Sequence, residues 1–405
     1  MKKIFIYFTA IFLLMISSSI AKTSLEWWQF WTDPTIKPVI NKMITEFETI
    51  NPDIEINVTD LTWSNGHEKI VIAFSSGTAP DIVELGSDWI AQFASKNKIA
   101  DITKLSKNEF GDYRGWNMAT YNDKIYAKPW FLGTRVIFYN KTLLKKAGFD
   151  DSFIPYKWDD LKNGAREITA LGKKYYGWGS NTAEKHRLYK KFMPFFWSNK
   201  AQLFTDDNKF CVLSSIKAIE AIKLYAWLHD SCGYVDNQRG IEDAFLDGKI
   251  GFIISGDWLL KRIELEKRRI NFGTTLIPGP TLPGRSFLGG EFLAISENSK
   301  NKEAAKKFID FITSAENQIE FCKANRTATP SSKLASQDEY FTSNPNLLIF
   351  NKQIHLAVNP PVDPDWVKIE AIIEEAVEEI IFNTDLIAEP LLDAQRKIEK
   401  IKGIE

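Results

Sequence analysis

Hydrophobic residues in the first part of the chain follow two periods, which predict strands and helices in alternation. Apolar residues alternate with polar ones, or follow one another directly, in short segments at residues 25–31, 54–58 and 81–85. Elsewhere apolar residues recur every three or four positions, which predicts helices at residues 35–50, 68–75 and 88–98. The order strand, helix, strand, helix is typical of an α/β domain in which helices cover parallel strands.

The same two patterns continue along the rest of the chain. Strands are predicted at residues 135–139, 250–254 and 272–277. Amphipathic helices are predicted at residues 303–312 and 366–382, the second with its acidic residues on the outer face. The sequence has no internal repeat, low-complexity tract or long linker. Two α/β lobes joined by several crossings of the chain would explain why no single linker stands out.

The first 21 residues have the features of a secretory signal peptide. A basic start, Met1-Lys2-Lys3, precedes an apolar run at residues 4–16, which is too short to span about 30 Å of hydrocarbon as an anchor. Small residues then predict cleavage after Ala21. Because Lys22 follows the cleavage point where a lipoprotein has cysteine, we expect a mature chain that is free in the periplasm and not lipid-anchored.

Composition and charge narrow the possible classes of function. The chain has 51 lysines and arginines against 52 aspartates and glutamates, so it lacks the basic surplus of a nucleic-acid binding protein. Four histidines leave little material for a metal site. Three cysteines exclude a disulfide scaffold. In an oxidising compartment Cys211 and Cys232 could form a bridge, and the alternative is three unpaired buried thiols.

Sequence motifs of catalysis and cofactor binding are absent. There is no phosphate-binding loop, nucleophile elbow, zinc-protease motif or C-x-x-C pair. We therefore expect no catalytic residue, metal or cofactor, and a binding protein in place of an enzyme. A secreted glycoside hydrolase is the alternative, because its two carboxylates would have no recognisable spacing among 52 acidic residues.

Tryptophans at the ends of predicted strands and helices are the candidate ligand contacts. The chain has 13 tryptophans, and those beside Gly, Asp or Pro at element ends are Trp31, Trp89, Trp130, Trp258 and Trp366. Ligands of open α/β sheets bind beyond the carboxyl ends of strands. Sugars suit such positions, because their C–H faces stack on aromatic rings and their hydroxyl groups bind carboxylates and amides. Trp227, in the middle of a helix, is instead expected in the core.

A series of motifs resembles the bacterial extracellular solute-binding proteins of the maltose-binding family. The segment Ser76-Gly77-Thr78-Ala79-Pro80-Asp81-Ile82-Val83 is similar to that family's S-G-x-x-P-D-[IV] signature. Further segments resemble the family in the same order along the chain, at residues 30–33, 47–54, 137–141, 256–258, 288–295 and 302–312. The resemblance covers nearly the whole mature chain.

This resemblance implies two α/β lobes, each a mixed sheet flanked by helices, with a ligand cleft at a hinge of several strands. By the family's pattern, residues 22–127 and 275–325 form the N-terminal lobe, and residues 128–274 and 326–405 form the C-terminal lobe. The implied protein is a monomer that captures a sugar or oligosaccharide in the periplasm. It would deliver this carbohydrate to the permease subunits of an ABC importer, which work with a cytoplasmic ATPase.

The resemblance also implies which residues bind the ligand. Asp88 falls where the family has an aspartate that accepts sugar hydroxyls, Trp258 matches the family's stacking tryptophan, and Trp366 resembles its C-terminal aromatic residue. The other candidates lie in segments expected to face the cleft: Trp31, Asp33, Trp89, Trp130, Trp197 and Glu291. The same fold could hold a non-sugar solute such as a glycerol phosphodiester, for which Arg135 and Arg239 are candidate anion-binding residues.

Overall fold

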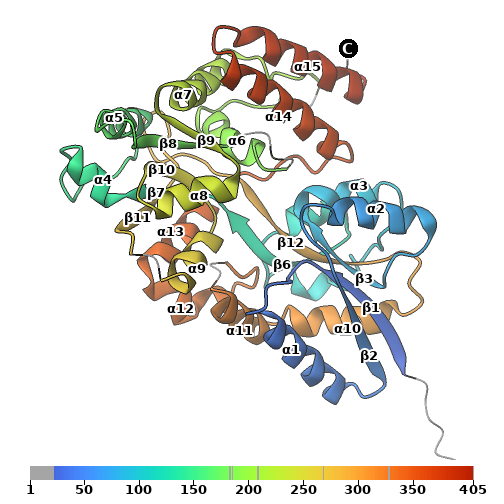
Figure 1. The fold of residues 1–405 in the computed structure, drawn as a ribbon. Coiled ribbons are helices and arrows are strands. Elements are labelled where there is room, and N and C mark those ends of the chain that lie inside the picture. Colours follow the sequence, from blue (N-terminus) through green and yellow to red (C-terminus); the bar gives the residue numbers. More distant parts are fainter. Residues whose placement is uncertain are drawn as a thin grey trace, which may run out of the picture.

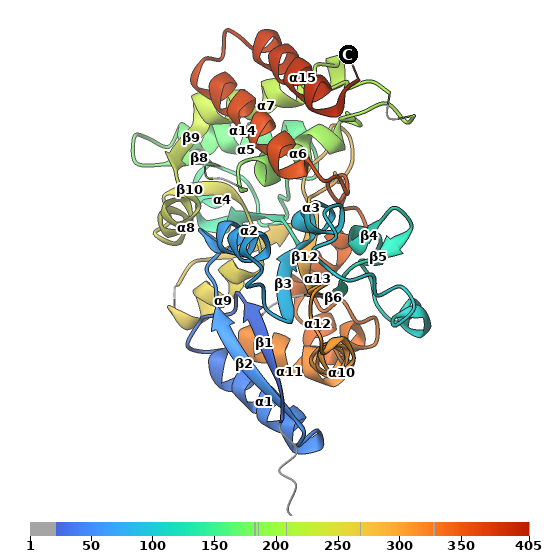
Figure 2. The same cartoon turned by 90° about the vertical axis from the view of Figure 1, so that its right-hand side faces the viewer.

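The computed structural model of the protein describes residues 22–181, 184, 186–207, 209–267, 269–326 and 329–404. The expected signal peptide and its cleavage point after Ala21 lie outside the described residues. The described chain forms two five-stranded sheets, each covered by helices, and these make two lobes (Figure 1). Seen from the side, the lobes stand one above the other (Figure 2).

The sheet of the N-terminal lobe has the strand order β2-β1-β3-β12-β6. Its strands are β1 (Thr23–Gln29), β2 (Ile54–Asp60), β3 (Ile82–Gly86), β6 (Lys128–Thr134) and β12 (Leu288–Ile295). β1 runs parallel to β2 and β3, whereas β12 runs antiparallel to β3 and β6. β3 is buried along its whole length, which explains its nearly continuous apolar sequence.

The sheet of the C-terminal lobe has the order β11-β7-β10-β8-β9. Its strands are β7 (Val136–Asn140), β8 (Tyr176–Asn181), β9 (Gly233–Asp236), β10 (Ile250–Ser255) and β11 (Phe272–Thr275). Parallel pairs join β10, β8 and β9, and antiparallel pairs join β7 to β10 and β11. Both sheets are therefore mixed, as the family resemblance implied. β4 (Thr120–Tyr121) and β5 (Lys124–Ile125) form a small separate ladder.

Helices surround both sheets. Those of the N-terminal lobe are α1 (Lys37–Ile50), α2 (Gly66–Ser76), α3 (Ile90–Ala94), α10 (Lys302–Ile312) and α11 (Ala315–Asn325). Those of the C-terminal lobe are α4 (Lys141–Lys146), α5 (Trp158–Thr169), α6 (Tyr189–Ser198), α7 (Ile216–Cys232), α8 (Gln238–Leu246), α9 (Trp258–Leu265), α14 (Trp366–Phe382) and α15 (Ala388–Lys402). α12 (Glu339–Ser343) and α13 (Pro345–Ile354) lie where the chain returns between the lobes.

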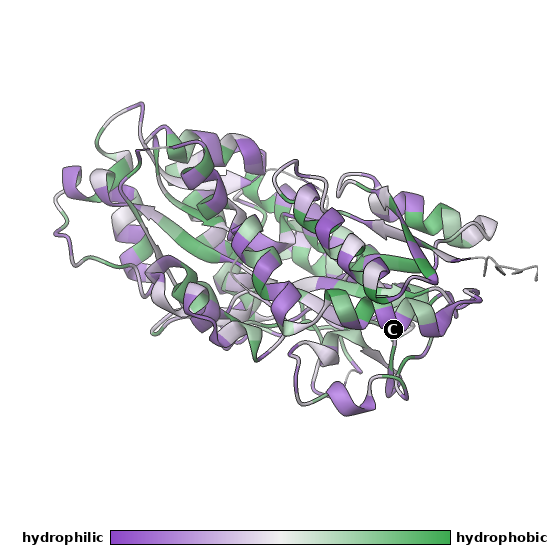
Figure 3. Ribbon diagram, turned by 90° about the horizontal axis from the view of Figure 1, so that it is seen from below, coloured by the Kyte–Doolittle hydropathy of each residue, from purple (hydrophilic) through white to green (hydrophobic). Residues whose placement is uncertain are grey.

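Local sequence sets the ends of several helices. α2 ends at Gly77, whose φ of 76° lies in the left-handed region that favours glycine. α4 begins at Asn140, whose side chain accepts a hydrogen bond from the Leu143 N–H. Hydrophobic positions gather on the strands and on the inward sides of the helices, while hydrophilic positions face outward (Figure 3). None of the helices in these described ranges is long and apolar enough to cross a membrane.

The chain passes between the lobes at Arg135, at residues 276–287 and after α11. The first two passages are joined, since Thr134 Oγ1 donates to Phe287 O and Ser286 Oγ donates to Arg135 O, each at 2.7 Å. Residues of the third passage pair alongside, because Val358 N–H donates to Ser286 O at 2.7 Å. This set of hydrogen-bonded segments is the expected multi-strand hinge.

Two lobe boundaries differ from the sequence-based prediction. β6 was expected in the C-terminal lobe but pairs with β12 in the first sheet, so the first crossing lies at Arg135 and not before Lys128. Pro129 is tolerated in β6 because this strand lies at the edge of the sheet. Beyond residue 326 the chain also stays with the N-terminal lobe for some residues, because Leu132 N–H donates to Thr329 O.

Two smaller predictions are corrected, and one open alternative is decided. Glu370 and Glu374 of α14 are buried, so the acidic residues of this helix do not all lie on its outer face. Of the two alternatives for Cys211 and Cys232, the structure has the one without a bridge: both are buried, one in a loop and the other at the end of α7. Trp227 is half-buried on α7, with Lys162 Nζ 5.0 Å from the centroid of its ring, because the helix presents it near the protein surface.

Candidate functional site

The carboxyl ends of β1, β2 and β3 meet at one edge of the N-terminal sheet, because these strands run parallel. The loops that follow carry Trp31 and Asp33, Trp63, and Asp88 with Trp89, in that order. β12 runs antiparallel and brings Glu291 to the same edge, opposite Gly86. This edge faces α6, α9 and Arg135, and we call the contact between them the lobe interface.

Asp88 makes the central contact of the lobe interface. Tyr189 Oη of α6 donates a hydrogen bond to Asp88 Oδ2 at 2.9 Å, and Lys190 Nζ lies 3.4 Å from the same oxygen. Burial by itself would raise the pKa of Asp88, but the Lys190 charge and the Tyr189 hydroxyl outweigh it and the pKa is lowered. Asp88 is thus a buried, charged acceptor held between the two lobes.

Residues of α14 hold the start of α6 in place. Glu374 accepts hydrogen bonds from the backbone N–H groups of Tyr189 (3.1 Å) and His186 (3.2 Å), and the His186 ring contacts Glu370. Burial, followed by repulsion from Glu370, raises the pKa of Glu374 to about 7. Trp366 is fully buried, and its ring lies edge-on to Tyr189 with centroids 5.7 Å apart. Trp366 therefore supports the tyrosine that contacts Asp88.

Arg135 lies between the lobes at the first crossing of the chain. Its guanidinium lies 4.6 Å from the centroid of the Trp258 ring and 5.4 Å from that of Phe287, over which Lys190 Nζ also lies at 4.9 Å. Burial lowers the pKa of Arg135, and the nearby charges of Asp257 and Glu291 oppose this shift. Arginine remains charged in proteins, so Arg135 and Lys190 bring two cations to one aromatic ring.

Trp258 and Glu291 complete this part of the interface. Trp258 is half-buried, and its Nε1–H donates to Glu242 Oε1 at 2.7 Å, which fixes the indole under Arg135. Burial and repulsion by Asp257 raise the pKa of Glu291 to about 7. The positive charges of Arg135 and Lys190 and a hydrogen bond from the Glu291 backbone N–H oppose this rise.

A second set of contacts closes the interface near Asp33. Lys261 Nζ of α9 lies 2.7 Å from Asp33 Oδ2 and 2.7 Å from Asn325 Oδ1 at the end of α11. Lys261 is buried, and it links the C-terminal lobe to two elements of the N-terminal lobe. A further hydrogen bond joins distant segments of the chain: Asn117 Nδ2 donates to Asn359 Oδ1 at 3.0 Å.

The structure brings only some of the predicted tryptophans to the lobe interface. Trp89 is buried beside Asp88, and Trp31 is half-buried at the same sheet edge. Trp130 is fully buried in the N-terminal core, because the register shifts in β6 and leaves Trp130 without a partner on β12. Trp197, two turns along α6 from Tyr189, lines a separate cavity of about 680 Å³ with Arg285.

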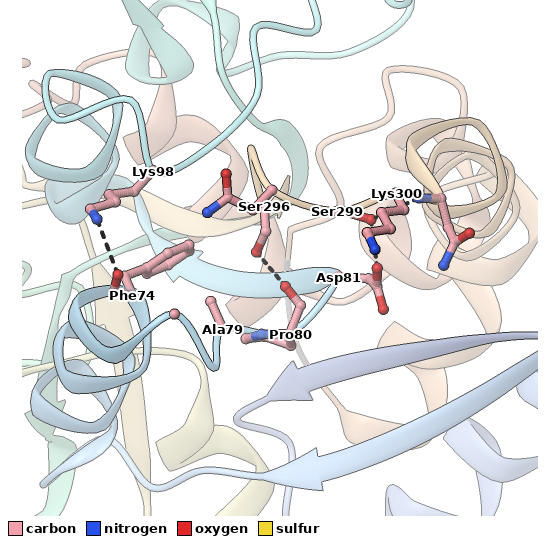
Figure 4. Close-up of a pocket in the computed structure, with 11 residues that line it drawn as sticks. Phe74, Ala79, Pro80, Asp81, Lys98, Ser296, Ser299 and Lys300 are labelled. Carbon is pink, nitrogen blue, oxygen red and sulfur yellow. Dashed lines mark hydrogen bonds between the residues drawn. The ribbon is translucent and has the colours of Figure 1, made fainter.

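The S-G-x-x-P-D segment lies at the opposite end of β3 from Asp88. It borders a cavity of about 260 Å³ between Phe74, Lys98 and Ser299 (Figure 4). There Asp81 accepts hydrogen bonds from Glu26 N–H at 3.1 Å and from Ser299 Oγ at 2.5 Å. These contacts fix the start of β3, so the segment identifies the fold and does not contact the lobe interface.

Several interface residues have no clear signal in the sequence. Tyr189 and Lys190 lie in a helix whose pattern is apolar, and only the packing of two lobes brings them to Asp88. Of the two arginines considered, Arg135 lies at the interface, whereas Arg239 is exposed on α8 and pairs with Asp243 and Glu266. In the described ranges, no group of three or more His, Cys, Asp or Glu side chains could hold a metal ion.

The fold and the interface define a two-lobed binding protein, and comparison with known proteins gives its family. A family model described as bacterial extracellular solute-binding protein matches residues 33–319. The chain therefore belongs to the bacterial extracellular solute-binding proteins, which act outside the cytoplasm. This membership confirms the resemblance found in the sequence motifs.

Relatives and solved structures agree with this assignment. A binding protein of Brucella abortus is 28% identical over 377 residues, which cover 90% of each chain. The maltodextrin-binding protein MdxE of Bacillus subtilis is 25% identical over 369 residues, covering 85% of this chain and 83% of the relative. The ABC transporter solute-binding protein of Thermotoga lettingae, solved with α-D-tagatose, has a TM-score of 0.84 at 23% identity and covers 94% of this chain and 100% of its own.

Proposed function

We propose that the protein binds a sugar or an oligosaccharide between its two lobes and delivers it to the permease subunits of an ABC importer. The observation that carries this proposal is the meeting of a charged carboxylate, a second carboxyl group and an arginine stacked on tryptophan at one interface. Sugar hydroxyls need such fixed charged partners, and sugar C–H faces need aromatic rings. A relative that is named for binding maltodextrin supports the ligand class.

Binding replaces contacts that the lobes make with each other. Tyr189 and Lys190 occupy Asp88 in the structure, so a sugar hydroxyl takes the place of one of these donors. Glu291 accepts from a further hydroxyl, and Arg135 donates from its position on Trp258. Trp31, Asp33 and Trp89 form the adjoining wall. The ligand leaves unchanged, because the protein supplies binding groups and no catalytic step.

The proposal includes the cellular setting. The chain is cut after Ala21 and works as a free monomer in the periplasm, where ligand-driven closure of the lobes presents it to the permease. Fractionation of the producing cells tests this part. The mature chain, beginning at Lys22, is expected in the periplasmic extract, and its recovery in a salt-resistant membrane fraction would contradict the free form.

A glycerol phosphodiester is a second candidate ligand, favoured by the position of two cations. Arg135 and Lys190 both lie over Phe287, at 5.4 and 4.9 Å from its centroid, and together could hold a phosphate group. Added salt would weaken such binding more than the binding of a neutral sugar.

A thermal-shift panel of saccharides and glycerol phosphodiesters tests the proposal. A ligand that binds only the native state stabilises it by about 2.7 kcal/mol at a hundredfold excess over its dissociation constant. We expect at least one saccharide to raise the melting temperature and to be recovered unchanged after incubation. A panel in which only phosphodiesters stabilise the protein favours the second candidate, and recovery of a cleaved saccharide would show an enzyme.

A further inference from the structure

The cavity of about 680 Å³ beside Trp197 lies next to the hinge. It is lined by the end of α6, the loop at residues 200–206 and the start of α7, together with two hinge passages, at Arg285 and at residues 358–361. None of the residues that surround Asp88, Arg135 or Asp33 at the lobe interface lines it. Its volume is that of a pocket for a small ligand, so it is a candidate for a second binding site.

Three cationic side chains and one carboxylate line this cavity. The cations are Lys200, Lys217 and Arg285, which are exposed, and none of them forms an ion pair within the described ranges. The carboxylate is that of Asp206, which accepts a hydrogen bond from Gln202 Nε2 at 2.7 Å. Positive charges gathered at one cavity repel one another, and an anion bound among them removes this repulsion.

The segment that carries Arg285 is held against the end of α6. The Arg285 N–H donates to Ser198 Oγ at 2.8 Å, and Ser198 Oγ lies 3.3 Å from Arg285 O. The two segments approach this closely because residue 284 is glycine, and a Cβ there would lie 2.2 Å from Ser198 Oγ. The backbone of Arg285 is therefore fixed beside the residues that lead to Lys200.

The start of α7 is held at the same place. Asn199 Nδ2 donates to Lys217 O at 2.7 Å and to Glu220 Oε2 at 2.9 Å. The Glu220 carboxylate is thus bound to an amide, and Glu220 does not line the cavity. Because Ser198, Asn199 and Lys200 follow one another in the chain, their contacts bring the backbones of all three cationic residues to the end of α6.

Lys200 occupies a backbone position that favours glycine. Its φ is 60°, in the left-handed region, and the Ala201 N–H donates to Phe196 O at 3.1 Å, as at helix ends that usually carry glycine. A lysine in this conformation costs free energy relative to glycine. Its side chain forms no hydrogen bond or ion pair within the described ranges, so the fold gains no such contact in return.

Trp197 and Phe204 add apolar surface to the cavity. Trp197 belongs to the core of the C-terminal lobe, and the half-buried Phe204 packs against that core. The loop of Phe204 is held in place, because the Val212 N–H donates to Leu203 O at 2.9 Å. An inorganic anion makes no use of these walls, whereas the organic part of a larger anion packs on them.

We propose that this cavity binds a small organic phosphate. Lys200, Lys217 and Arg285 hold the phosphate group, and Trp197 and Phe204 pack on the organic part. A phosphate monoester suits these cations, because it carries about −1.5 to −2 charges at pH 7 and a guanidinium can bind it through two hydrogen bonds. This inference goes beyond the proposed function and does not depend on it, since the phosphate occupies a site apart from the lobe interface.

Calorimetric titration of the mature chain at low ionic strength tests the site. The probes are glycerol 3-phosphate, phenyl phosphate and inorganic phosphate, with glycerol and benzyl alcohol as uncharged counterparts. We expect an organic phosphate to bind more tightly than inorganic phosphate and than its uncharged counterpart. Arg285→Gln and Lys200→Gly each weaken this binding at least tenfold. Lys200→Gly keeps or raises the ligand-free melting temperature, because glycine suits the backbone there, so its loss of affinity does not come from a damaged fold.

Two controls locate the bound phosphate. Lys223→Gln removes an exposed cation of α7 that does not line the cavity, and it leaves the affinity unchanged. Amide hydrogen exchange with the phosphate bound is expected to show added protection at residues 198–206 and 283–286 and none at residues 87–93.

Several results would overturn the site. Unchanged affinity in Arg285→Gln and Lys200→Gly would place the anion elsewhere, and protection at residues 87–93 would then favour Arg135 and Lys190 of the lobe interface. Equal affinity for inorganic and organic phosphates would contradict an organic ligand. No binding of any soluble phosphate at millimolar concentration, or binding only to phosphatidylglycerol vesicles, would also show that the inference is wrong. None of these results bears on saccharide binding at the lobe interface.

Discussion

Asp88 is the residue on which the proposed recognition depends most. Its carboxylate is buried and charged because Tyr189 and Lys190 hold it. Hydrogen bonds to a charged group are worth roughly 1.5–3 kcal/mol against about 1 kcal/mol for neutral ones. A sugar hydroxyl that binds Asp88 therefore depends on the charge as well as on the shape of this side chain.

Asp88→Asn is expected to weaken saccharide binding about tenfold while the fold is kept. Asparagine retains an oxygen that can accept from Tyr189, but it removes the negative charge beside Lys190. Titration calorimetry measures the loss, and the ligand-free melting temperature serves as the control. Wild-type affinity in this variant would show that Asp88 only joins the lobes and does not contact the ligand.

The raised pKa of Glu374, which holds the start of α6, makes the free energy of unfolding depend on pH. A carboxyl group whose pKa is about 7 in the folded state and near 4.5 when unfolded binds its proton more tightly in the fold. Its contribution to stability is therefore greatest below pH 4.5 and declines as the pH rises from 4.5 to 7. The buried position of Glu374 on α14, next to Glu370, is the cause.

Glu374→Gln is expected to flatten this decline, because glutamine resembles the protonated acid at every pH. Urea unfolding at steps between pH 4 and 8 measures the free energy of unfolding for both proteins. Lys368→Gln, an exposed substitution on the same helix, should leave the pH dependence of the free energy of unfolding as it is in wild type. If the free energy of unfolding of Glu374→Gln declines with pH as steeply as that of wild type, this carboxyl group does not cause the decline.

At the scale of elements, α14 joins the core of the C-terminal lobe to the lobe interface. Its apolar face packs into that core, and its first residue, Trp366, is fully buried against Tyr189. Truncating a buried aromatic residue costs about 3–5 kcal/mol of stability. Trp227 on α7 is half-buried, so its truncation removes less buried apolar surface.

Trp366→Ala is therefore expected to cost about 3–5 kcal/mol of unfolding free energy, and Trp227→Ala clearly less. Urea unfolding, fitted with the same denaturant dependence for both variants, gives the two free energies of unfolding. Normal stability of Trp366→Ala, combined with lost saccharide binding, would contradict this account. It would support the direct ligand contact that the family resemblance implied.

Sequence patterns were informative where one element determines the position of a residue. The alternation of apolar and polar residues predicted β1, α1, β2, α2 and β3 within a few positions of the structure. Asp88 and Glu291 became candidates through the family resemblance, which places both in segments that face the cleft. Trp63 also follows a predicted strand, so its place beyond a strand end is visible in the sequence as well.

The rest of the interface depends on packing between distant segments. Trp130 is buried because of a register shift between β6 and β12, which no single segment encodes. Tyr189 reaches Asp88 across 101 residues of sequence. Glu374 faces inward because α14 packs on α6, whereas a helical pattern alone places a charged side chain in solvent.

At the scale of the whole molecule, a few side-chain contacts join the two lobes, and Lys261 makes a central one. It is buried and lies 2.7 Å from both Asp33 Oδ2 and Asn325 Oδ1. Removing the Lys261 charge leaves the Asp33 carboxylate without its partner. The carboxylate is then more stable in water than at the interface. Since the two sides belong to different lobes, the resulting preference is for an opened hinge.

Lys261→Met is expected to enlarge the radius of gyration of the ligand-free protein. Methionine keeps the length and apolar stem of the side chain but removes its charge. Small-angle scattering measures the change, with Lys323→Met as the control, because Lys323 pairs with Asp338 away from the C-terminal sheet. A radius equal to that of wild type would show that this contact does not bias closure.

The most direct test of the account is amide hydrogen exchange with and without a saturating saccharide that raises the melting temperature. Binding between the lobes predicts added protection in both of them, at residues 87–93 after β3, at the start of α6 and in the hinge at residues 286–291. Protection confined to one lobe, or to the cavity beside Trp197, would contradict a ligand held at the lobe interface.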